Sequence, residues 1–328
     1  MRMRYLDGIG TGKPMSRIGL GTWQFGSREW GYGADYSSQE ADLIVARAAE
    51  LGITVFDTAE AYGFGSSERI LGAALAAHGL GERAFVATKI FPVFPVAAVV
   101  RQRGRASAAR LGVSTIDLYQ VHQPNPVVRD GTTMAGMRDL QDGGLVSEVG
   151  VSNYSLARWK DAESALGRRV LSNQVQFSLA HPAPLDELVP FAASQGRVVI
   201  AYSPLAQGLL SARYDATNRP SGGVRAMNPL FLPENLERAE SLLGTLGEVA
   251  RTHQSTPAQV ALAWLIYHPN VVVIPGASSV AQVEANAAAA DIALGDDEVA
   301  ELTAQARRFR PVGGLTAARS IALARLHC

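Results

Sequence analysis

The stretch AFVATK at residues 84–89 runs through small, aromatic and β-branched side chains and ends in a lysine. Continuous apolar runs of this kind are typical of parallel strands that are covered on both faces. The stretch IDLYQVH at residues 116–122 ends in the same way, in a histidine. Working outward from these two, we predict eight strands. They are Ile18–Thr22, Thr54–Asp57, Phe85–Lys89, Ile116–His122, Ser147–Val151, Val170–Val175, Val198–Tyr202 and Val271–Pro275.

Helical patterns separate these strands. Residues 37–40, Ser-Ser-Gln-Glu, have the spacing of a capping box, Ile44 and Ala48 share one helical face behind them, and Gly52 ends the pattern. Polar residues at the strand ends recur about every 30 residues, which is the length of one unit in an eight-unit barrel of about 250 residues. The sequence therefore predicts an α/β fold, a (β/α)8 TIM barrel, as a single domain over residues 1–328.

Three segments depart from this repeat. Arg4–Arg17 contains several turn residues and is predicted to form an N-terminal hairpin. A long insertion after the seventh strand, residues 205–237, is expected to act as a lid, because long loops in compact domains are usually functional. The tail, residues 311–328, carries an amphipathic run from Leu315 to Leu326 that could close the pocket, pack outside the barrel or dock on a second subunit. A homo-oligomer formed through this tail is thus one expectation.

Composition excludes several classes of protein. The 30 Lys and Arg balance the 30 Asp and Glu, and no basic block is present, which argues against a nucleic-acid partner. The single cysteine, Cys328, allows no intrachain disulfide. The first residues have no apolar core typical of a signal peptide, and no apolar run reaches the roughly 18 residues of a membrane span. We therefore expect a cytoplasmic protein without a membrane partner.

Four polar side chains at or just after consecutive strand ends are the candidates for chemistry. Active sites of such barrels lie at the carboxyl ends of the strands. Asp57, Lys89 and His122 end three predicted strands, and Tyr62 follows in the loop after Asp57. A lysine beside a tyrosine favours the phenolate and lowers the tyrosine pKa, and a buried lysine needs a carboxylate partner. Asp57, Lys89 and Tyr62 could therefore form a tuned proton donor, with His122 orienting the oxygen that receives the proton.

Taken singly, each of these residues has a simpler interpretation. Asp57 could cap a turn, Tyr62 could be a half-buried aromatic residue, and His122 could be a hydrogen-bonded core imidazole. Lys89 is harder to explain structurally, because lysine is seldom buried without a partner.

These residues belong to blocks that resemble the aldo-keto reductase family, nearest to its bacterial and potassium-channel β-subunit branch. The blocks follow one another in the family's order over nearly the whole chain. They are GLGTWQFG at 19–26, FDTAEAYG at 56–63, ATK at 87–89, DLYQVH at 117–122, EVGVSN at 148–153, NQVQFS at 173–178, IAYSPLAQG at 200–208 and VVVIPGASS at 271–279. By this resemblance Asp57, Tyr62, Lys89 and His122 form the catalytic tetrad, with Tyr62 as the general acid.

The resemblance also implies an extended nicotinamide cofactor across the barrel mouth, without a Rossmann domain. Its implied contacts fall into a nicotinamide group, a pyrophosphate group and an adenosine group. They are Thr22, Trp23, Asp57, Ser152, Asn153, Gln174 and Tyr202 for the first, Ser203, Leu205, Gln207 and Gly208 for the second, and Gly276, Ser278, Gln282 and Asn286 for the third. The glycine-rich GIGTGK at 8–13 lacks the spacing of a phosphate-binding P-loop.

Helix chemistry is compatible with the adenosine group. Residues 276–279 follow the eighth strand and open a helix, whose free N–H groups attract phosphate. A plain helix cap at Ser278 or Ser279 explains the same residues equally well.

Two departures from the family pattern concern the cofactor. Many members have an arginine where this chain has Gln282 and a glutamate where it has Ala285, and no Lys or Arg lies between Val271 and Glu301. The glutamine resembles the channel-subunit branch, whose members still use NADPH. We therefore expect NADPH, with NADH as the alternative.

Aromatic residues near the expected mouth indicate a mainly apolar pocket. They are Trp23, Trp30, Phe64, Phe91 and Phe94, with Met227 and Phe231 in the insertion. Trp264 is instead expected in the core. The other histidines lack metal-binding spacing, so no metal is expected.

The leading hypothesis is NADPH-dependent reduction of a small-molecule aldehyde or ketone, such as a keto-sugar or a secondary-metabolite ketone, to the alcohol. A cofactor-sensing regulatory subunit with weak catalysis is the alternative. A hydrolase using Asp57 and Glu60 as paired carboxylates is a third interpretation, but it leaves Lys89 unexplained.

Overall fold

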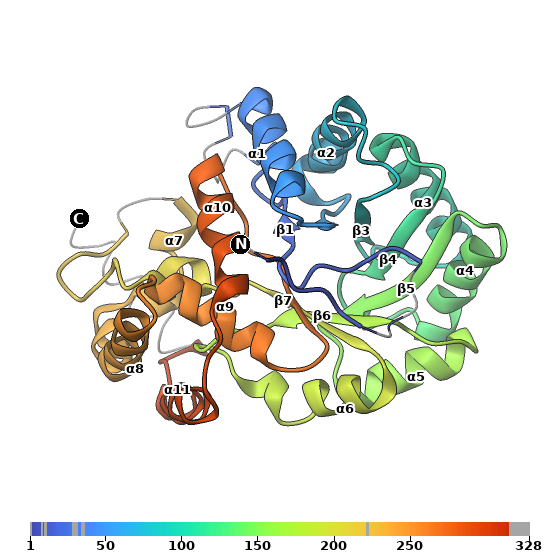
Figure 1. Ribbon diagram of the computed structural model, residues 1–328. Coiled ribbons are helices and arrows are strands. Elements are labelled where there is room, and N and C mark those ends of the chain that lie inside the picture. Colours follow the sequence, from blue (N-terminus) through green and yellow to red (C-terminus); the bar gives the residue numbers. More distant parts are fainter. Residues whose placement is uncertain are drawn as a thin grey trace, which may run out of the picture.

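The computed structural model describes residues 2–7, 9, 12–27, 32–33, 37–220 and 223–314. Eight parallel strands pair in sequence order, as Figure 1 shows at the centre of the molecule. The strands are β1 (Leu20–Gly21), β2 (Val55–Asp57), β3 (Phe85–Ile90), β4 (Ile116–Val121), β5 (Val146–Ser152), β6 (Ser172–Gln176), β7 (Val198–Tyr202) and β8 (Val271–Val273). All eight predicted strands are present, with ends that differ by a few residues.

The first and last strands are joined. Isolated parallel bridges pair Ile18 with Val273 and Gly21 with Gly276. The amide of Gly19 donates to the carbonyl of Val273 at 2.8 Å. These contacts are consistent with the predicted (β/α)8 barrel.

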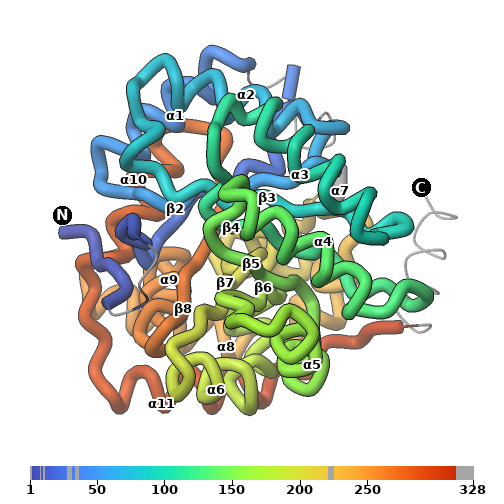
Figure 2. Tube along the Cα trace, turned by 90° about the vertical axis from the view of Figure 1, so that its right-hand side faces the viewer, coloured from blue at the N-terminus to red at the C-terminus, as the bar shows by residue number. Residues whose placement is uncertain are grey.

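Helices cover the outside of the strands in both Figure 1 and Figure 2. They are α1 (Ser38–Glu50), α2 (Ser66–Ala77), α3 (Ala97–Leu111), α4 (Asp130–Asp142), α5 (Leu156–Leu166), α6 (Leu188–Gln195), α7 (Gly223–Ala226), α8 (Pro233–Thr252), α9 (Pro257–Tyr267), α10 (Val280–Ala288) and α11 (Asp296–Arg308). Helix α1 begins at the predicted cap, where the Ser37 amide donates to Glu40 Oε2 at 2.6 Å. None of the helices in the described part of the chain is long and apolar enough to cross a membrane.

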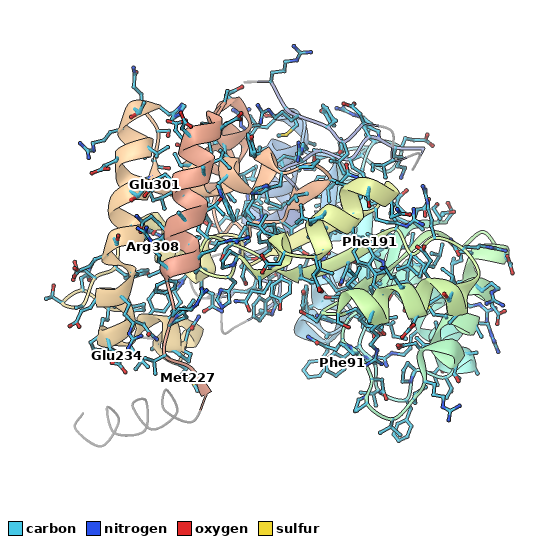
Figure 3. All side chains as sticks on the ribbon, turned by 90° about the horizontal axis from the view of Figure 1, so that it is seen from below. Phe91, Phe191, Met227, Glu234, Glu301 and Arg308 are labelled. Carbon is cyan, nitrogen blue, oxygen red and sulfur yellow. The ribbon has the colours of Figure 1, made fainter. Side chains whose placement is uncertain are left out.

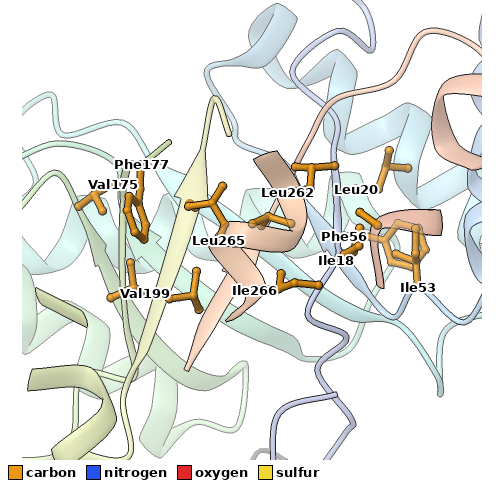
Figure 4. Packing of buried hydrophobic residues seen from close by; sticks show 14 of the residues in the cluster. Ile18, Leu20, Ile53, Phe56, Val175, Phe177, Val199, Leu262, Leu265 and Ile266 are labelled. Atoms are coloured by element: carbon orange, nitrogen blue, oxygen red, sulfur yellow. The ribbon is translucent and has the colours of Figure 1, made fainter. Parts of the chain in front are cut away.

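Nearly all strand residues are buried, on both faces of each strand, with Ser147 and Glu148 near the start of β5 among the exceptions. This burial explains the continuous apolar runs. The face toward the helices joins a large core that contains Phe56, Val86 and the fully buried Trp264, and Figure 4 shows its packing around α9. Alternate residues form a second, inner cluster that includes Val55 and Phe85. Because side chains alternate along a strand, Asp57, two residues after Val55, and Lys89, four residues after Phe85, occupy inward positions as well.

The N-terminal segment closes the opposite end of the strands. Tyr5 and Ser16 form an antiparallel bridge, as expected of a hairpin. Ile9 and Met15 of this segment pack in the inner cluster. The predicted turn residues 8, 10 and 11 lie outside the described residues.

The insertion after β7 is more regular than a loop. It contains the 3-10 turns Ala206–Ser211 and Pro229–Phe231 besides α7, and α8 begins at Pro233, inside the predicted insertion. The proline suits the first turn of a helix because its missing N–H would be unpaired there. The lid function of this segment stays a prediction.

The tail is described only as far as Gly314. Asn235 of α8 fixes its first part, since Val312 N donates to Asn235 Oδ1 at 2.6 Å and Asn235 Nδ2 donates to Val312 O at 3.0 Å. The amphipathic run Leu315–Leu326, and with it the expected oligomer contact, lies outside the described residues.

The seam between β1 and β8 predicts a sensitive glycine. A Cβ atom at Gly21 would lie 2.7 Å from the carbonyl oxygen of Ile274, so Gly21→Ala should push the two strands apart. We expect a loss of about 1–3 kcal/mol in the free energy of unfolding, measured by urea denaturation. Gly244→Ala on α8 is the matched control, because a Cβ there meets nothing within 4 Å. It should gain about 0.5–1 kcal/mol from helix propensity, and an equal loss in both variants would contradict the close approach.

Candidate active site

A buried ion pair joins the carboxyl ends of β2 and β3. Lys89 is 0% exposed, and its Nζ donates to Asp57 Oδ2 at 2.6 Å and to the Thr58 carbonyl at 2.9 Å. The second carboxylate oxygen, Asp57 Oδ1, accepts from Gln174 Nε2 of β6 at 2.7 Å. A charge removed from water must be compensated by partners at this distance. Asp57 and Gln174 therefore fix the position of the ammonium group.

Tyr62 is the third member of this cluster. It begins a 3-10 turn, Tyr62–Gly65, that follows β2. Its hydroxyl oxygen lies 3.3 Å from Lys89 Nζ. Tyr62, Lys89 and Asp57 thus form one chain of polar contacts that reaches from the half-buried phenol to the buried carboxylate.

The pKa of Tyr62 is raised, whereas the sequence predicts that Lys89 lowers it. Burial raises it, Lys89 lowers it, and the net result is a raised pKa, because desolvation of the phenolate outweighs the nearby ammonium. Burial also opposes the charge of Lys89, but Asp57 and Tyr62 outweigh it and raise the lysine pKa. At neutral pH the pair consists of a neutral phenol beside a charged ammonium.

His122 faces this phenol. Its backbone N–H donates to the Ile90 carbonyl at 2.9 Å, which fixes it beside β3. The ring centroids of His122 and Tyr62 are 5.7 Å apart in an edge-on arrangement. Burial and the Lys89 charge lower the pKa of His122 to about 3. The imidazole is therefore neutral near pH 7, with Nδ1 buried and unpartnered among the described residues.

Amide and hydroxyl groups of β5, β6 and β7 form a second network next to the ion pair. Ser152 Oγ donates to the Gln174 carbonyl at 2.8 Å, and Asn153 Nδ2 donates to Ser152 Oγ at 3.1 Å. Tyr202 Oη donates to Asn153 Oδ1 at 2.9 Å. The structure therefore brings together the predicted nicotinamide group on these strands. Gln174 connects it to Asp57.

The remaining residues of that group lie after β1. Thr22 Oγ1 donates to the Asp57 carbonyl at 2.9 Å. The ring of Trp23 stacks on that of Tyr62, with centroids 6.0 Å apart. Trp30, which is expected with Trp23 near the mouth of the barrel, lies outside the described residues.

The predicted pyrophosphate group lies on a tight turn after β7. Ser203, Gln207 and Gly208 all have positive φ angles, and Leu205 accepts the Gly208 N–H through its carbonyl at 2.9 Å. The guanidinium of Arg225 donates to the Gln207 carbonyl at 2.9 Å. Arg225 thus places a positive charge beside this turn. The sequence alone does not predict this contact, because Arg225 lies 18 residues after Gln207.

The predicted adenosine group surrounds the start of α10. Ser279 is the helix cap, with its Oγ accepting from Gln282 N at 3.3 Å, so the capping interpretation holds for this serine. The Gln282 side chain accepts from Ser278 N at 2.9 Å, and Asn286 Nδ2 reaches the Gly276 carbonyl at 3.5 Å. None of these contacts connects to the Tyr62 cluster.

A comparison of the sequence with protein families decides the classification. The family model of the aldo/keto reductase family matches residues 17–307. The chain belongs to the aldo/keto reductase family. It is an oxidoreductase that acts on carbonyl groups.

Relatives and solved structures agree with this membership. An uncharacterized oxidoreductase of Mycobacterium tuberculosis is 61% identical over 310 residues, which cover 94% of this chain and 95% of that protein. A solved thermostable aldo-keto reductase has a TM-score of 0.77 at 30% identity, covering 92% of this chain and 100% of the other. The aldo/keto reductase of Klebsiella pneumoniae in complex with NADP and acetate has a TM-score of 0.71 at 28% identity, covering 92% and 94%.

In this aldo/keto reductase a second ion pair lies near the first. Glu60 binds Arg103 of α3, with Arg103 Nε 2.9 Å from Glu60 Oε2, and it also accepts the N–H of Phe91. The sequence suggests Glu60 only as a partner of Asp57 in the hydrolase interpretation. Because each carboxylate has its own cation, the paired-carboxylate hydrolase finds no support. Among the described residues, no group of three His, Cys, Asp or Glu side chains could hold a metal ion.

The pKa of His122 leads to a prediction about acid sensitivity. An ordinary histidine titrates near pH 6.5. We expect the His122 ring to stay neutral from about pH 8 down to about pH 5, because its folded-state pKa is lowered to about 3. Below about pH 6.5 the unfolded chain gains a proton that the folded chain does not. Protonation of His122 in the unfolded chain therefore lowers the free energy of unfolding progressively as the pH falls from about 6.5 toward 3.

Long-range ¹H–¹⁵N NMR of the imidazole nitrogens measures this titration, and the His122→Gln spectrum assigns the signal. Unfolding free energies of His122→Gln should fall less steeply with decreasing pH than those of the parent protein. A His122 midpoint near pH 6.5 would show that the ring is not desolvated as described.

Proposed function

We propose that this aldo/keto reductase uses NADPH to reduce an aldehyde or ketone to the alcohol, with Tyr62 as the general acid. The observation that carries the proposal is the contact of Tyr62 Oη with Lys89 Nζ, whose charge Asp57 maintains in a fully buried position. Few structural roles require a lysine to be buried against a phenol.

The proton transfer follows from this arrangement. A carbonyl oxygen that accepts a hydrogen bond from Tyr62 becomes more basic as the carbonyl carbon is reduced, and it takes the phenol proton. The raised pKa of Tyr62 keeps the phenol protonated before the reaction. The Lys89 charge then stabilises the phenolate that forms.

His122 complements Tyr62 without competing as an acid. With a pKa lowered to about 3, its ring is neutral at physiological pH and can donate a hydrogen bond to the same carbonyl oxygen while keeping its own proton. Asp57, Lys89, Tyr62 and His122 together therefore make up the proposed catalytic group.

The donor set of the chain fits a nicotinamide dinucleotide. When bound, the reduced nicotinamide supplies the hydride. The ring of Tyr202 and the amides of Asn153 and Gln174 would hold the nicotinamide end, and Arg225 beside Gln207 would neutralise phosphate charge. The remaining contacts proposed from the sequence, Thr22, Trp23, Ser152, Ser203, Leu205, Gly208, Gly276, Ser278, Gln282 and Asn286, keep their proposed places.

NADPH is the proposed form of the cofactor. The related structure from Klebsiella pneumoniae was determined with NADP. NADH remains the alternative, and the regulatory-subunit hypothesis gains no support from the relatives reported above.

The substitution Tyr62→Phe tests the proposed acid. It removes the proton but keeps the ring that packs on Trp23, so we expect turnover to fall by roughly 10²–10⁴-fold while cofactor binding persists. NADPH oxidation followed by absorbance measures turnover, and quenching of tryptophan fluorescence measures binding.

Tyr267→Phe is the matched control, because Tyr267 is an exposed tyrosine whose hydroxyl contacts Asp296 at 2.7 Å on the outside of the molecule. It should leave turnover unchanged. Unchanged turnover in Tyr62→Phe would exclude Tyr62 as the acid.

A further inference from the structure

Three hydroxyl groups meet in the buried space beside the Asp57–Lys89 ion pair. They belong to Thr22 after β1, Thr58 after β2 and Ser67 in the first turn of α2, and all three residues are 0% exposed. Ser67 Oγ lies 2.8 Å from Thr22 Oγ1 and 2.8 Å from Thr58 Oγ1. We call these three residues the hydroxyl cluster.

The hydroxyl cluster also binds the backbone next to the ion pair. Thr22 Oγ1 donates to the Asp57 carbonyl at 2.9 Å, and Ser67 Oγ donates to the Thr22 carbonyl at 2.8 Å. The following carbonyl, that of Thr58, accepts from Lys89 Nζ at 2.9 Å. The cluster therefore connects α2 to the ends of β1 and β2, and a displacement of Thr58 also moves an acceptor of the buried ammonium.

The partners determine the direction in which each hydroxyl donates. The hydroxyl protons of Thr22 and Ser67 have backbone carbonyls to bind. Thr58 therefore donates to Ser67 Oγ, its acceptor among the described residues. A buried donor that loses its acceptor is costly. Ser67 is thus the residue on which the other two hydroxyl groups converge.

The segment that carries Tyr62 runs directly into this cluster. Between Tyr62 and Ser67, the φ angles are 54° at Gly63, 52° at Phe64 and 81° at Gly65. The left-handed region is costly for a residue other than glycine, and with Phe64 96% exposed little internal packing offsets the cost. A strained segment of this kind persists only when the surrounding structure fixes it.

Two consecutive residues of α2 fix the end of the strained segment. Ser67 binds the ends of β1 and β2 through the hydroxyl cluster. The next residue, Glu68, is also 0% exposed and accepts from Thr88 Oγ1 of β3 at 2.6 Å. Thr88 directly precedes Lys89. The start of α2, five residues after Tyr62, is therefore held against the strands that carry both charged members of the site.

We propose that the hydroxyl cluster positions the Tyr62 phenol against the Lys89 ammonium, with Thr58 and Ser67 as positioning residues for the proposed reduction. The contact of Tyr62 Oη with Lys89 Nζ, at 3.3 Å, is the longest of the three that this ammonium makes, so a small displacement separates the two groups. Thr58 and Ser67 act through Lys89 and Tyr62. The inference rests on the proposed function, in which Tyr62 is the acid.

The substitution Thr58→Val tests the cluster, because it keeps the shape of the side chain and removes the O–H that Ser67 accepts. We expect kcat for the reduction of benzaldehyde by NADPH to fall at least about tenfold, with KM changed less than about twofold, since a misplaced proton donor affects the chemical step. Ser67→Ala removes the shared partner and should lower kcat further, by up to about 10²-fold. Thr58→Ser keeps the hydroxyl and should restore most of the parent kcat.

Thr303→Val is the matched control. The Thr303 hydroxyl also donates to a backbone carbonyl, at 2.6 Å, and accepts a side-chain hydrogen bond, at 3.0 Å. It lies on α11 before Arg308, which Figure 3 shows on the opposite side of the molecule from Phe91, two residues after Lys89. Thr303→Val should lower the melting temperature and leave kcat unchanged. A kcat of Thr58→Val that equals that of Thr303→Val would overturn the inference.

NMR of tyrosines labelled with ¹³C at Cζ tests the position of Tyr62 without turnover, and Tyr62→Phe assigns its signal. At pH 7 this signal should shift in Thr58→Val and in Ser67→Ala, return in Thr58→Ser and stay unchanged in Thr303→Val. These shifts in a protein that reduces no carbonyl would support the hydroxyl cluster and refute the proposed function. An unshifted Tyr62 signal in both Thr58→Val and Ser67→Ala would overturn this inference and leave the reductase intact.

Discussion

The ammonium group of Lys89 is buried at the carboxyl ends of the strands. This single charge determines which polar groups must surround it. A cation without water requires an anion at contact distance and further acceptors for its remaining protons. Asp57 on the neighbouring strand supplies the anion, and the Thr58 carbonyl and the Tyr62 hydroxyl complete the set. Parallel pairing of β2 with β3 places Asp57 opposite Ala87, two residues before Lys89, so the inward-pointing side chains of Asp57 and Lys89 are neighbours on the same face.

The alternation of side chains along β3 keeps two buried polar clusters apart. Lys89 points inward, whereas the preceding Thr88 points toward the helices and donates to the buried Glu68 at 2.6 Å. Arg110 of α3 neutralises Glu68 from the outside at 2.5 Å. One strand thus supports the proposed catalytic cluster on its inner face and a structural cluster on its outer face. The structural cluster ties α2 to α3, the helix that follows residues 91–96.

Rigidity at this end of the barrel comes from side chains that bind the backbone. Glu60, Arg103, Asn125 and Thr133 hold the loop after β3 from four different segments. These contacts order the loop within the folded chain, because its backbone groups have partners from segments that are distant in the sequence.

The sequence by itself determined the strand order, the two-sided burial of the strands and the candidate residues at their ends. Continuous apolar runs and capping patterns are local properties, and local chemistry is enough to predict them. Tertiary structure alone decided which distant partners meet. Gln174 reaches Asp57 across 117 residues, and Glu60 reaches Arg103 across 43, and no spacing rule predicts either contact. The raised pKa of Tyr62 is likewise decided by the tertiary structure. It depends on how much water the folded chain excludes from the phenol, and this exclusion is a property of the whole packed molecule.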